Sequence, residues 1–283
     1  MKTNRLSERA VLVHFQSHEW TGRKMDKRLA DETANVQQAD KDALEVIVRL
    51  VPPKALMPIK SARANMYKQF VSLSLPWMDG AIRILPTNNF LEFREKMRKC
   101  REAYDKAVSD FLAEWPTIVA DTKRLGKLHD KYKLPTCSDL KQRFDVKIDI
   151  LPVPDIADWR AKLGDDEAAE IAAEVKNNIE SLVTNAMKSI WSQLGEFVGR
   201  IADTMSKKEK KFRSSIFDNL IKFCESIPKL NLTNDEELEK IRKEVIKLCN
   251  VDIFELREIP NSRKKVAEEA KDVLSKIEQY MKK

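Results

Sequence analysis

Residues 87–125 read TNNFLEFREKMRKCREAYDKAVSDFLAEWPTIVADTKRL, and this pattern predicts one long helix from Thr87 to Leu125. Apolar side chains recur along the stretch at every third or fourth residue. Their mean spacing of about 3.5 residues is that of a coiled-coil seam. Because one helix cannot bury its own apolar stripe, this helix needs a partner. The seam consists of Phe90, Phe93, Met97, Cys100, Tyr104, Val108, Phe111, Trp115 and Ile118.

A second long helix, from Asp165 to Met205, is the predicted partner. Its apolar positions have a mean spacing of about 3.7 residues, close to an eleven-residue repeat. Because the two spacings differ, a long two-stranded coil is disfavoured and a compact antiparallel bundle is favoured. Pro116 lies within the first helix and predicts a kink or a break near Trp115.

Shorter elements are predicted around the two long helices. Three stretches rich in β-branched and aromatic residues predict strands at 8–16, 81–85 and 146–150, which would form a small sheet at one end of the helical body. Helices are predicted to open at Thr21 or Gly22, to run from Lys41 to Leu50, and to run from just after Pro53 to Phe70. Gly126 is predicted to end the first long helix, and Ser138 and Thr233 to cap later ones.

Residues 207–283 predict a C-terminal helical subdomain, with segments near 210–227, 235–249, 253–257 and 262–281. The predicted fold is mainly α, of the α+β class. It combines an antiparallel long-helix bundle, a small three-stranded sheet and the C-terminal helices. We expect two domains: residues 1–206, which contain the sheet and the helical hairpin 87–125/165–205, and residues 207–283.

Composition bounds the class of protein. The 283 residues are 42% hydrophobic and 34% charged with only six glycines, a balance typical of a helical globular protein. No apolar run approaches the roughly 20 residues that a membrane span needs. The N-terminal stretch lacks a signal-peptide pattern and the four cysteines are dispersed, so we expect reduced thiols in a cytoplasmic protein. The formal net charge of +7 permits an acidic or nucleic-acid partner without requiring one.

Four short motifs together resemble a known family. They are Trp20-Thr21-Gly22-Arg23-Lys24 followed by Asp26; Leu75-Pro76-Trp77 with Asp79-Gly80, Arg83 and Leu85-Pro86; Leu125-Gly126; and Phe144 with Leu151-Pro152-Val153-Pro154. In this order and spacing the chain resembles, over about residues 8–165, a family of tailed-phage and prophage proteins called domain of unknown function 3150.

The resemblance implies an accessory protein of a phage or prophage, in the host cytoplasm, with no known reaction. Genes of this family often lie near those of MoxR-like AAA+ ATPases and von Willebrand factor A domain proteins. By analogy, the resemblance suggests an assembly or remodelling partner of that kind. Residues 207–283 match no pattern of the family.

Catalytic and metal-binding patterns are weak in this chain. His14 and His18 could share a face, but only His129 remains as a third histidine, without a recognised ligand spacing. The acids at 165–167 suit the positive end of a helix dipole. With so few glycines, a phosphate loop is nearly excluded, and the GxxxG of Gly195 and Gly199 predicts close helix packing. We therefore expect no enzyme, no metal and no cofactor.

Basic clusters are the main candidates for nucleic-acid contact. One lies beside Trp20, a second lines the start of the first long helix, and a third follows the second long helix. Acids interrupt each cluster, which is the pattern of a solvated helix face. The candidate nucleic-acid contacts are Lys207, Lys208, Lys210, Lys211 and Arg213.

The family motifs offer a different kind of site. Trp20 and Trp77 could be core anchors, the usual role of tryptophan. The charged motif residues could form a buried salt-bridge network or a surface that docks a partner. The candidate docking set is Trp20, Arg23, Lys24, Asp26, Trp77, Asp79 and Arg83.

Three functions follow from these patterns. The leading hypothesis is a non-enzymatic accessory protein that acts by assembly with itself or with a protein partner. The alternative is a nucleic-acid-binding factor that uses its basic helix faces. A membrane-acting amphipathic protein is the third, and the chain shows no apolar span that would support it.

Overall fold

The computed structural model describes residues 6–78, 82–121, 124–129, 131–154, 165–207 and 212–281. The fold is mainly α with a small antiparallel sheet, as predicted. Its contacts divide the chain into two compact units. The α6 unit comprises Met1–His14, Val71–Phe93 and Asp149–Lys283, and the α4 unit comprises Phe15–Phe70 and Arg94–Ile148. These units cut across the predicted domains of 1–206 and 207–283, which stay a prediction.

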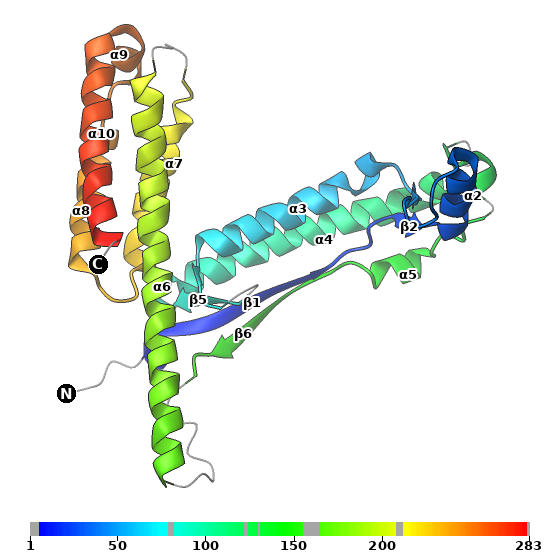
Figure 1. The fold of residues 1–283 in the computed structure, drawn as a ribbon, viewed down its shortest axis with the longest axis horizontal. Coiled ribbons are helices and arrows are strands. Elements are labelled where there is room, and N and C mark those ends of the chain that lie inside the picture. The colour runs from blue at the N-terminus through cyan, green and yellow to red at the C-terminus, as the bar shows by residue number, and fades with distance from the viewer. Residues whose placement is uncertain are drawn as a thin grey trace. The chain divides into compact units, whose positions relative to one another are not determined.

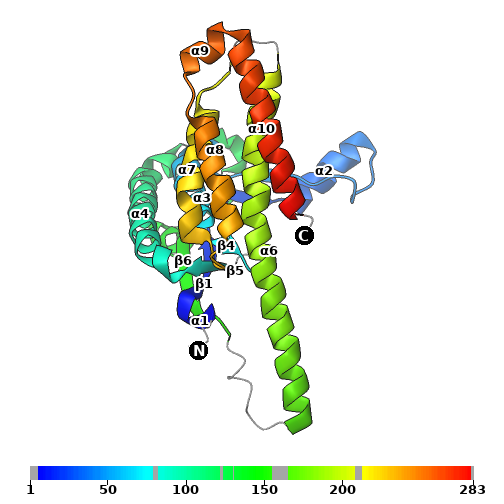
Figure 2. The ribbon, with the colours of Figure 1, turned by 90° about the vertical axis from the view of Figure 1, so that its left-hand side faces the viewer.

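The α6 unit is built on α6 (Asp165–Ser206), whose C-terminal half is covered by three helices (Figures 1 and 2). These are α7 (Ser215–Leu230), α8 (Glu236–Cys249) and α10 (Pro260–Met281), with the short α9 (Ile253–Glu258) leading into α10. Their bounds agree with the predicted C-terminal segments within a few residues. Asp235 rather than Thr233 caps α8, because its carboxylate accepts the backbone N–H groups of Glu237 and Leu238.

Two glycines of α6 lie against α10. A Cβ atom on Gly195 would lie 3.4 Å from Ile277, and one on Gly199 would lie 3.8 Å from Leu274. The predicted role of this GxxxG in helix packing is confirmed. One turn earlier, the Trp191 ring stacks on Tyr280 with centroids 5.2 Å apart.

The N-terminal half of α6 lies beyond the ends of α7, α8 and α10 (Figure 2). Its apolar positions Ile171, Val175, Ile179 and Leu182 are only partly buried. The C-terminal half of the predicted seam is thus covered by the C-terminal helices of the same unit. The predicted antiparallel pairing with the first long helix would join the two units, and it stays a prediction.

A four-stranded sheet has the order β4-β5-β1-β6. Strand β1 (Ala10–His18) pairs antiparallel with β5 (Ile82–Pro86), with Ala10 opposite Pro86 and His14 opposite Ile82. β4 (Leu75–Pro76) extends the sheet beyond β5, and β6 (Asp145–Pro152) lies beside β1. The three predicted strands are confirmed. Short turns α1 (Leu6–Arg9) and η1 (Thr87–Asn89) flank β1 and β5 in the sequence.

The α4 unit holds the first long helix and the second sheet. Its helices are α2 (Lys27–Gln37), α3 (Pro53–Ser72), α4 (Phe90–Ala120), α5 (Cys137–Lys141) and η3 (Gly126–Leu128), although α3 ends and α4 begins in the α6 unit. Strands β2 (Arg23–Met25) and β3 (Ile47–Arg49) pair antiparallel. An aromatic cluster fills this core, with Phe111 packed against Trp115 and Phe144.

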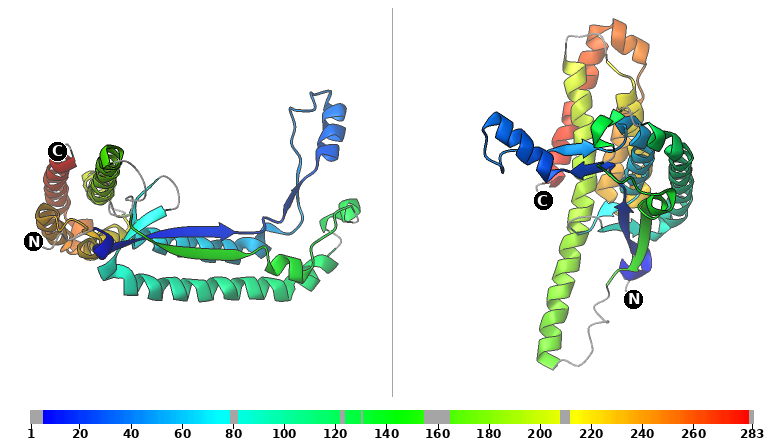
Figure 3. Two further views of the ribbon diagram at one scale, coloured as in Figure 1. Left: turned by 90° about the horizontal axis from the view of Figure 1, so that it is seen from below. Right: turned by 90° about the vertical axis from the view of Figure 1, so that its right-hand side faces the viewer.

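Helix α4 continues through Pro116, so the predicted break does not occur (Figure 3). Proline removes the N–H that would bond the carbonyl four residues earlier, which here belongs to Leu112. The Cys137 thiol lies 3.9 Å from that carbonyl and donates to it. A contact from α5 thus compensates for the missing helix bond.

Four local predictions are wrong. Residues 41–50 contain β3 instead of a helix, because Ile47 and Val48 pair with β2 and Val48 is buried. The helix expected at Thr21 or Gly22 begins after Asp26. Helix α4 ends at Ala120, ahead of Gly126, and Thr136 rather than Ser138 caps α5 through a capping box.

Truncation of the α6 core should destabilise the protein. Leu194→Ala removes a fully buried side chain and should lower the free energy of unfolding by about 2–5 kcal/mol. Leu91→Ala is the matched control, because Leu91 is 80% exposed and should change stability by less than about 0.5 kcal/mol. Urea denaturation measures both, and equal losses would contradict the assignment of the core.

Candidate functional site

The candidate site begins at a tight turn before β2. Gly22 has φ of +65°, and its carbonyl accepts the Leu50 N–H at 2.7 Å. A Cβ on Gly22 would lie 2.6 Å from Val51, so only glycine fits this turn. Trp20, just ahead of the turn, is buried edge-on against Trp115 with ring centroids 5.5 Å apart. Trp20 is thus a core anchor that fixes where β2 begins.

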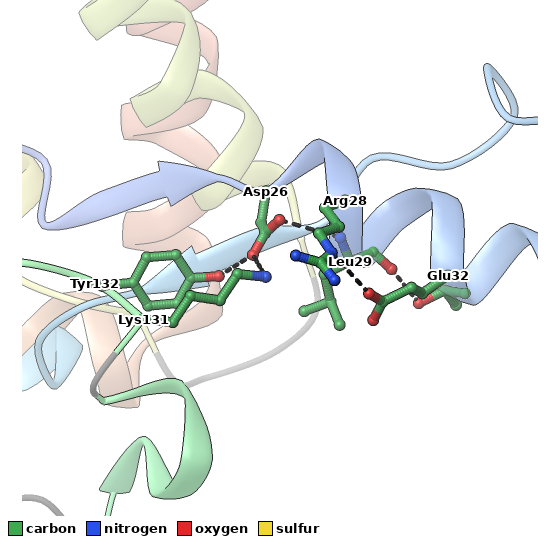
Figure 4. Close-up of polar contacts among 7 residues, drawn as sticks. Asp26, Arg28, Leu29, Glu32, Lys131 and Tyr132 are labelled. Carbon is green, nitrogen blue, oxygen red and sulfur yellow. Dashed lines mark hydrogen bonds and ion pairs between the residues drawn. The ribbon is translucent and has the colours of Figure 1, made fainter.

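Asp26 lies at the end of β2 and gathers three donors on a buried carboxylate (Figure 4). Its Oδ1 accepts the Leu29 N–H at 3.0 Å, which caps the N-terminus of α2. Its Oδ2 lies 2.7 Å from Lys131 Nζ and also accepts the Tyr132 hydroxyl. Nearby Arg28 bonds Glu32 on the exposed side of α2 instead (Figure 4).

The protonation states in this cluster are well defined. The hydrogen bond from Lys131, followed by those from Tyr132 and Leu29, holds the Asp26 pKa well below its usual value. Burial, with the Asp26 charge beside it, raises the Tyr132 pKa to about 12. At neutral pH the carboxylate is therefore ionised and the phenol is a neutral donor.

A pocket of about 400 Å³ opens beside this cluster. Lys24 lies over the Tyr132 ring, with its Nζ 5.5 Å from the ring centroid, and the Lys131 Nζ lies 5.8 Å from the same centroid. Asp26 neutralises one of the surrounding lysines, so the pocket keeps a positive charge. It is lined by Lys24, Met25, Asp26, Lys27, Lys131 and Tyr132.

The outer face of the β2–β3 ribbon carries two cross-strand pairs. Arg23 lies opposite Arg49, and Met25 lies opposite Ile47. All four side chains are exposed, and Met25 and Ile47 are 50% and 51% exposed. Because residues two apart share a face, the four form one surface, which we call the docking face.

The other predicted docking residues lie in the α6 unit. Trp77 is buried in the core of that unit. The Arg83 guanidinium donates to the Ser74 hydroxyl at 2.8 Å and to backbone carbonyls of Ser74 and Val71. Asp79 lies outside the described residues. The sequence suggested a salt-bridge network among the charged motif residues. In the structure, the charge partner of Asp26 is instead Lys131.

The predicted nucleic-acid contacts are only partly described. Lys207 and Arg213 are exposed. Lys208, Lys210 and Lys211 lie outside the described residues. The basic start of α4 is a solvated face, as its pattern predicted, because its cations bond acids one turn away, among them Arg98 with Glu102 and Lys99 with Glu95.

Sequence reasoning missed Lys131, Tyr132, Ile47 and Arg49. The first two lie in a connector more than 100 residues after Asp26, and the other two lie on the strand read as a helix. For Lys131 and Tyr132, the one available signal in the sequence was the stretch Lys131-Tyr132-Lys133 in a connector. Among the described residues, no cluster of His, Cys, Asp and Glu could hold a metal ion.

Comparisons with known proteins identify no relative. No protein-family model matches the chain, and neither a curated protein nor a solved structure matches it. The resemblance to the tailed-phage family stays a prediction. No helix in the described part of the chain is both long enough and apolar enough to cross a membrane.

Alanine at Gly22 should be much more costly than alanine at Gly126. Both glycines have left-handed backbone, with φ of +65° and +53°, but no described atom lies within 4 Å of a Cβ on Gly126. Gly126→Ala should therefore cost only the backbone term of about 1–2 kcal/mol. Gly22→Ala adds the clash with Val51 and should cost clearly more in urea denaturation. Equal losses would show that the turn relaxes.

Asp26→Asn should make the stability of the protein less dependent on pH in the acidic range. Asparagine keeps the helix cap but loses the charge that Lys131 balances. Because folding lowers the Asp26 pKa, this carboxylate stabilises the protein above about 3.8, its ordinary value, and less as the pH falls below it. Urea midpoints of the wild type should therefore exceed those of the variant at pH 6, and the difference between them should be smaller at pH 3. Asp31→Asn controls for the loss of a surface carboxylate on the same helix.

Proposed function

We propose that this protein is a non-enzymatic interaction protein that docks an acidic protein partner on the docking face of β2 and β3. One observation carries the proposal: an exposed apolar pair, Met25 and Ile47, lies directly beside an exposed pair of arginines, Arg23 and Arg49. An apolar centre with a charged rim is the usual composition of a protein interface.

The charge of the face favours an acidic partner. Like charges placed opposite one another on a sheet destabilise it. Within the described part of the chain, neither Arg23 nor Arg49 has an ion-pair partner. Carboxylates of a partner would accept the forked N–H groups of both guanidinium groups and remove this repulsion.

The backbone of the ribbon offers a second mode of contact. In the described chain, β2 and β3 pair only with each other, and the Arg49 carbonyl on the outer edge of β3 accepts a hydrogen bond from Arg124, so the outer edge of β2 is the one left for a partner strand. An extended segment of a partner can add to such an edge, with backbone bonds giving affinity and side-chain contacts giving specificity. The partner that fits best presents an extended acidic segment with alternating apolar residues.

The face is held in place before any partner arrives. The Asp26 cluster ties the end of β2 to residues 131 and 132, and the Gly22 turn fixes its start. A preorganised surface loses less conformational entropy on binding. The motif resemblance supports an AAA+ ATPase or a von Willebrand factor A protein as the kind of partner, or a second copy of the chain.

Nucleic-acid binding is the second candidate. The pocket of Lys24, Lys27 and Lys131 favours it, because three amines converge there on one side. The aromatic residues beside them, Trp20 and Tyr132, are buried, so they offer no platform for base stacking. Acidic protein is therefore preferred as the partner.

A designed acidic peptide tests the docking face directly. A fluorescent peptide of alternating Glu and Val should bind the full-length protein at low salt, and a Lys-for-Glu version should not. Arg23→Glu with Arg49→Glu should weaken binding at least tenfold, since two charge-assisted contacts become repulsive. Lys54→Glu with Lys60→Glu is the control: these exposed α3 residues make the same charge change away from the face. Fluorescence polarisation measures the binding of the two peptides to the wild type and of the acidic peptide to the two double variants.

Three outcomes would overturn the proposal. The first is equal binding of both peptides, and the second is an equal loss of binding in both double variants. The third is retardation of DNA or RNA in a low-salt gel shift that Arg23→Glu with Arg49→Glu abolishes, which would assign the face to nucleic acid. Light scattering after size exclusion shows whether a second copy occupies the face.

A further inference from the structure

A second cavity lies where α6 ends, within the α6 unit. It has a volume of about 460 Å³ and lies between the last turn of α6, the end of α9 and the first turns of α10. Among the described residues that line it, five are cationic and one, Glu268, is acidic. The cationic residues are Lys207, Arg257, Arg263, Lys264 and Lys271.

Arg263 is the innermost of these cations and is only 6% exposed. Its Nη2 donates to the carbonyls of Lys207 at 2.7 Å and Thr204 at 3.3 Å. Within the described residues its Nε–H has no hydrogen-bond partner. A buried donor left without a partner costs roughly 1–3 kcal/mol, and such groups are rare in native proteins.

A second arginine contacts the same aromatic ring as Arg263. Arg257 and Arg263 lie 5.7 Å and 5.9 Å from the centroid of the Phe212 ring. The ring interacts favourably with both cations. Both guanidinium groups also line the cavity, and each offers the planar, forked donor geometry that suits a phosphate or carboxylate.

A purely structural role explains part of this arrangement. Arg263 closes the C-terminus of α6, where free carbonyls attract a cation. That role uses Nη2 alone. It leaves the buried Nε–H without a partner, and it gives no reason for Arg257, Lys264 and Lys271 to line the same cavity. An anion in the cavity would balance the excess charge of these cations.

We propose that this cavity binds the phosphate group of a small phosphorylated molecule, with Arg263 and Arg257 as its direct donors and Lys264 and Lys271 as flanking charges. The proposal does not rest on the docking face, which lies in the other unit. A volume of about 460 Å³ is within the range of small-molecule sites and exceeds the need of a bare phosphate ion. A diphosphate or a nucleotide fits it better.

Calorimetry with pyrophosphate and with ATP tests the site on the full-length protein. At low salt, at least one should bind with one-to-one stoichiometry and a dissociation constant below about 1 mM. Lys264→Gln with Lys271→Gln should weaken binding at least tenfold. Lys222→Gln with Lys265→Gln is the control, because both residues are exposed on the same unit, lie outside the cavity lining and carry the same charge change. The affinity of this control variant should stay within about twofold of that of the wild type.

A second measurement follows Arg263 itself. Arg263→Lys retains a cation for the helix carbonyls but lacks the Nε–H, so it identifies the Arg263 Nε–H signal in an NMR spectrum. That signal should shift during a pyrophosphate titration of the wild-type protein. The proposal is overturned if neither probe binds at 1 mM, if both double variants lose affinity equally, or if the Arg263 signal does not move. Binding of duplex DNA alone would also overturn it, in favour of a polyanion surface.

Discussion

An amphipathic helix must bury its apolar stripe, and α6 satisfies this constraint over its C-terminal half only. There, α10 packs against the face of α6 that carries Gly195 and Gly199, and α7 covers the remaining side. This packing brings the first turns of α10 to the last turn of α6. Arg263 can therefore reach the carbonyls of Thr204 and Lys207, and the surrounding cations come together as a consequence. The cavity at this end of α6 depends on how the helix core is packed.

In the α4 unit, the buried carboxylate of Asp26 determines the arrangement of the site, as helix packing does in the α6 unit. Asp26 would be costly to bury alone, and three donors balance it: one from its own helix and two from residues 131 and 132. Because the donors come from distant parts of the chain, the cluster fixes the end of β2 against the connector. This internal network therefore fixes the orientation of the outer face of the ribbon, which carries Met25 and Ile47.

Much of the helical structure was predictable, and most of the site was not. Long periodic helices such as α4 and α6 follow from local sequence, since their apolar spacing extends over many turns. Strand β3 has three residues and exists because β2 pairs with it, so a local pattern could not reveal it. Likewise, Pro116 is accommodated by the Cys137 thiol, and Asp26 by Lys131 and Tyr132. These are tertiary contacts, which spacing along the chain does not encode.

The positive charge of the protein is unevenly balanced, and this distinguishes the proposed binding surfaces from solvated faces. Along α4, cations bond acids one turn away, so the helix surface is locally close to neutral. At the docking face and in the Arg263 cavity, by contrast, cations lie beside one another with few acids near them. Such clusters raise the free energy of the isolated chain through repulsion, which a bound anion or acidic partner would relieve. The net charge of +7 therefore carries less information than the places where the described residues leave positive charge uncompensated.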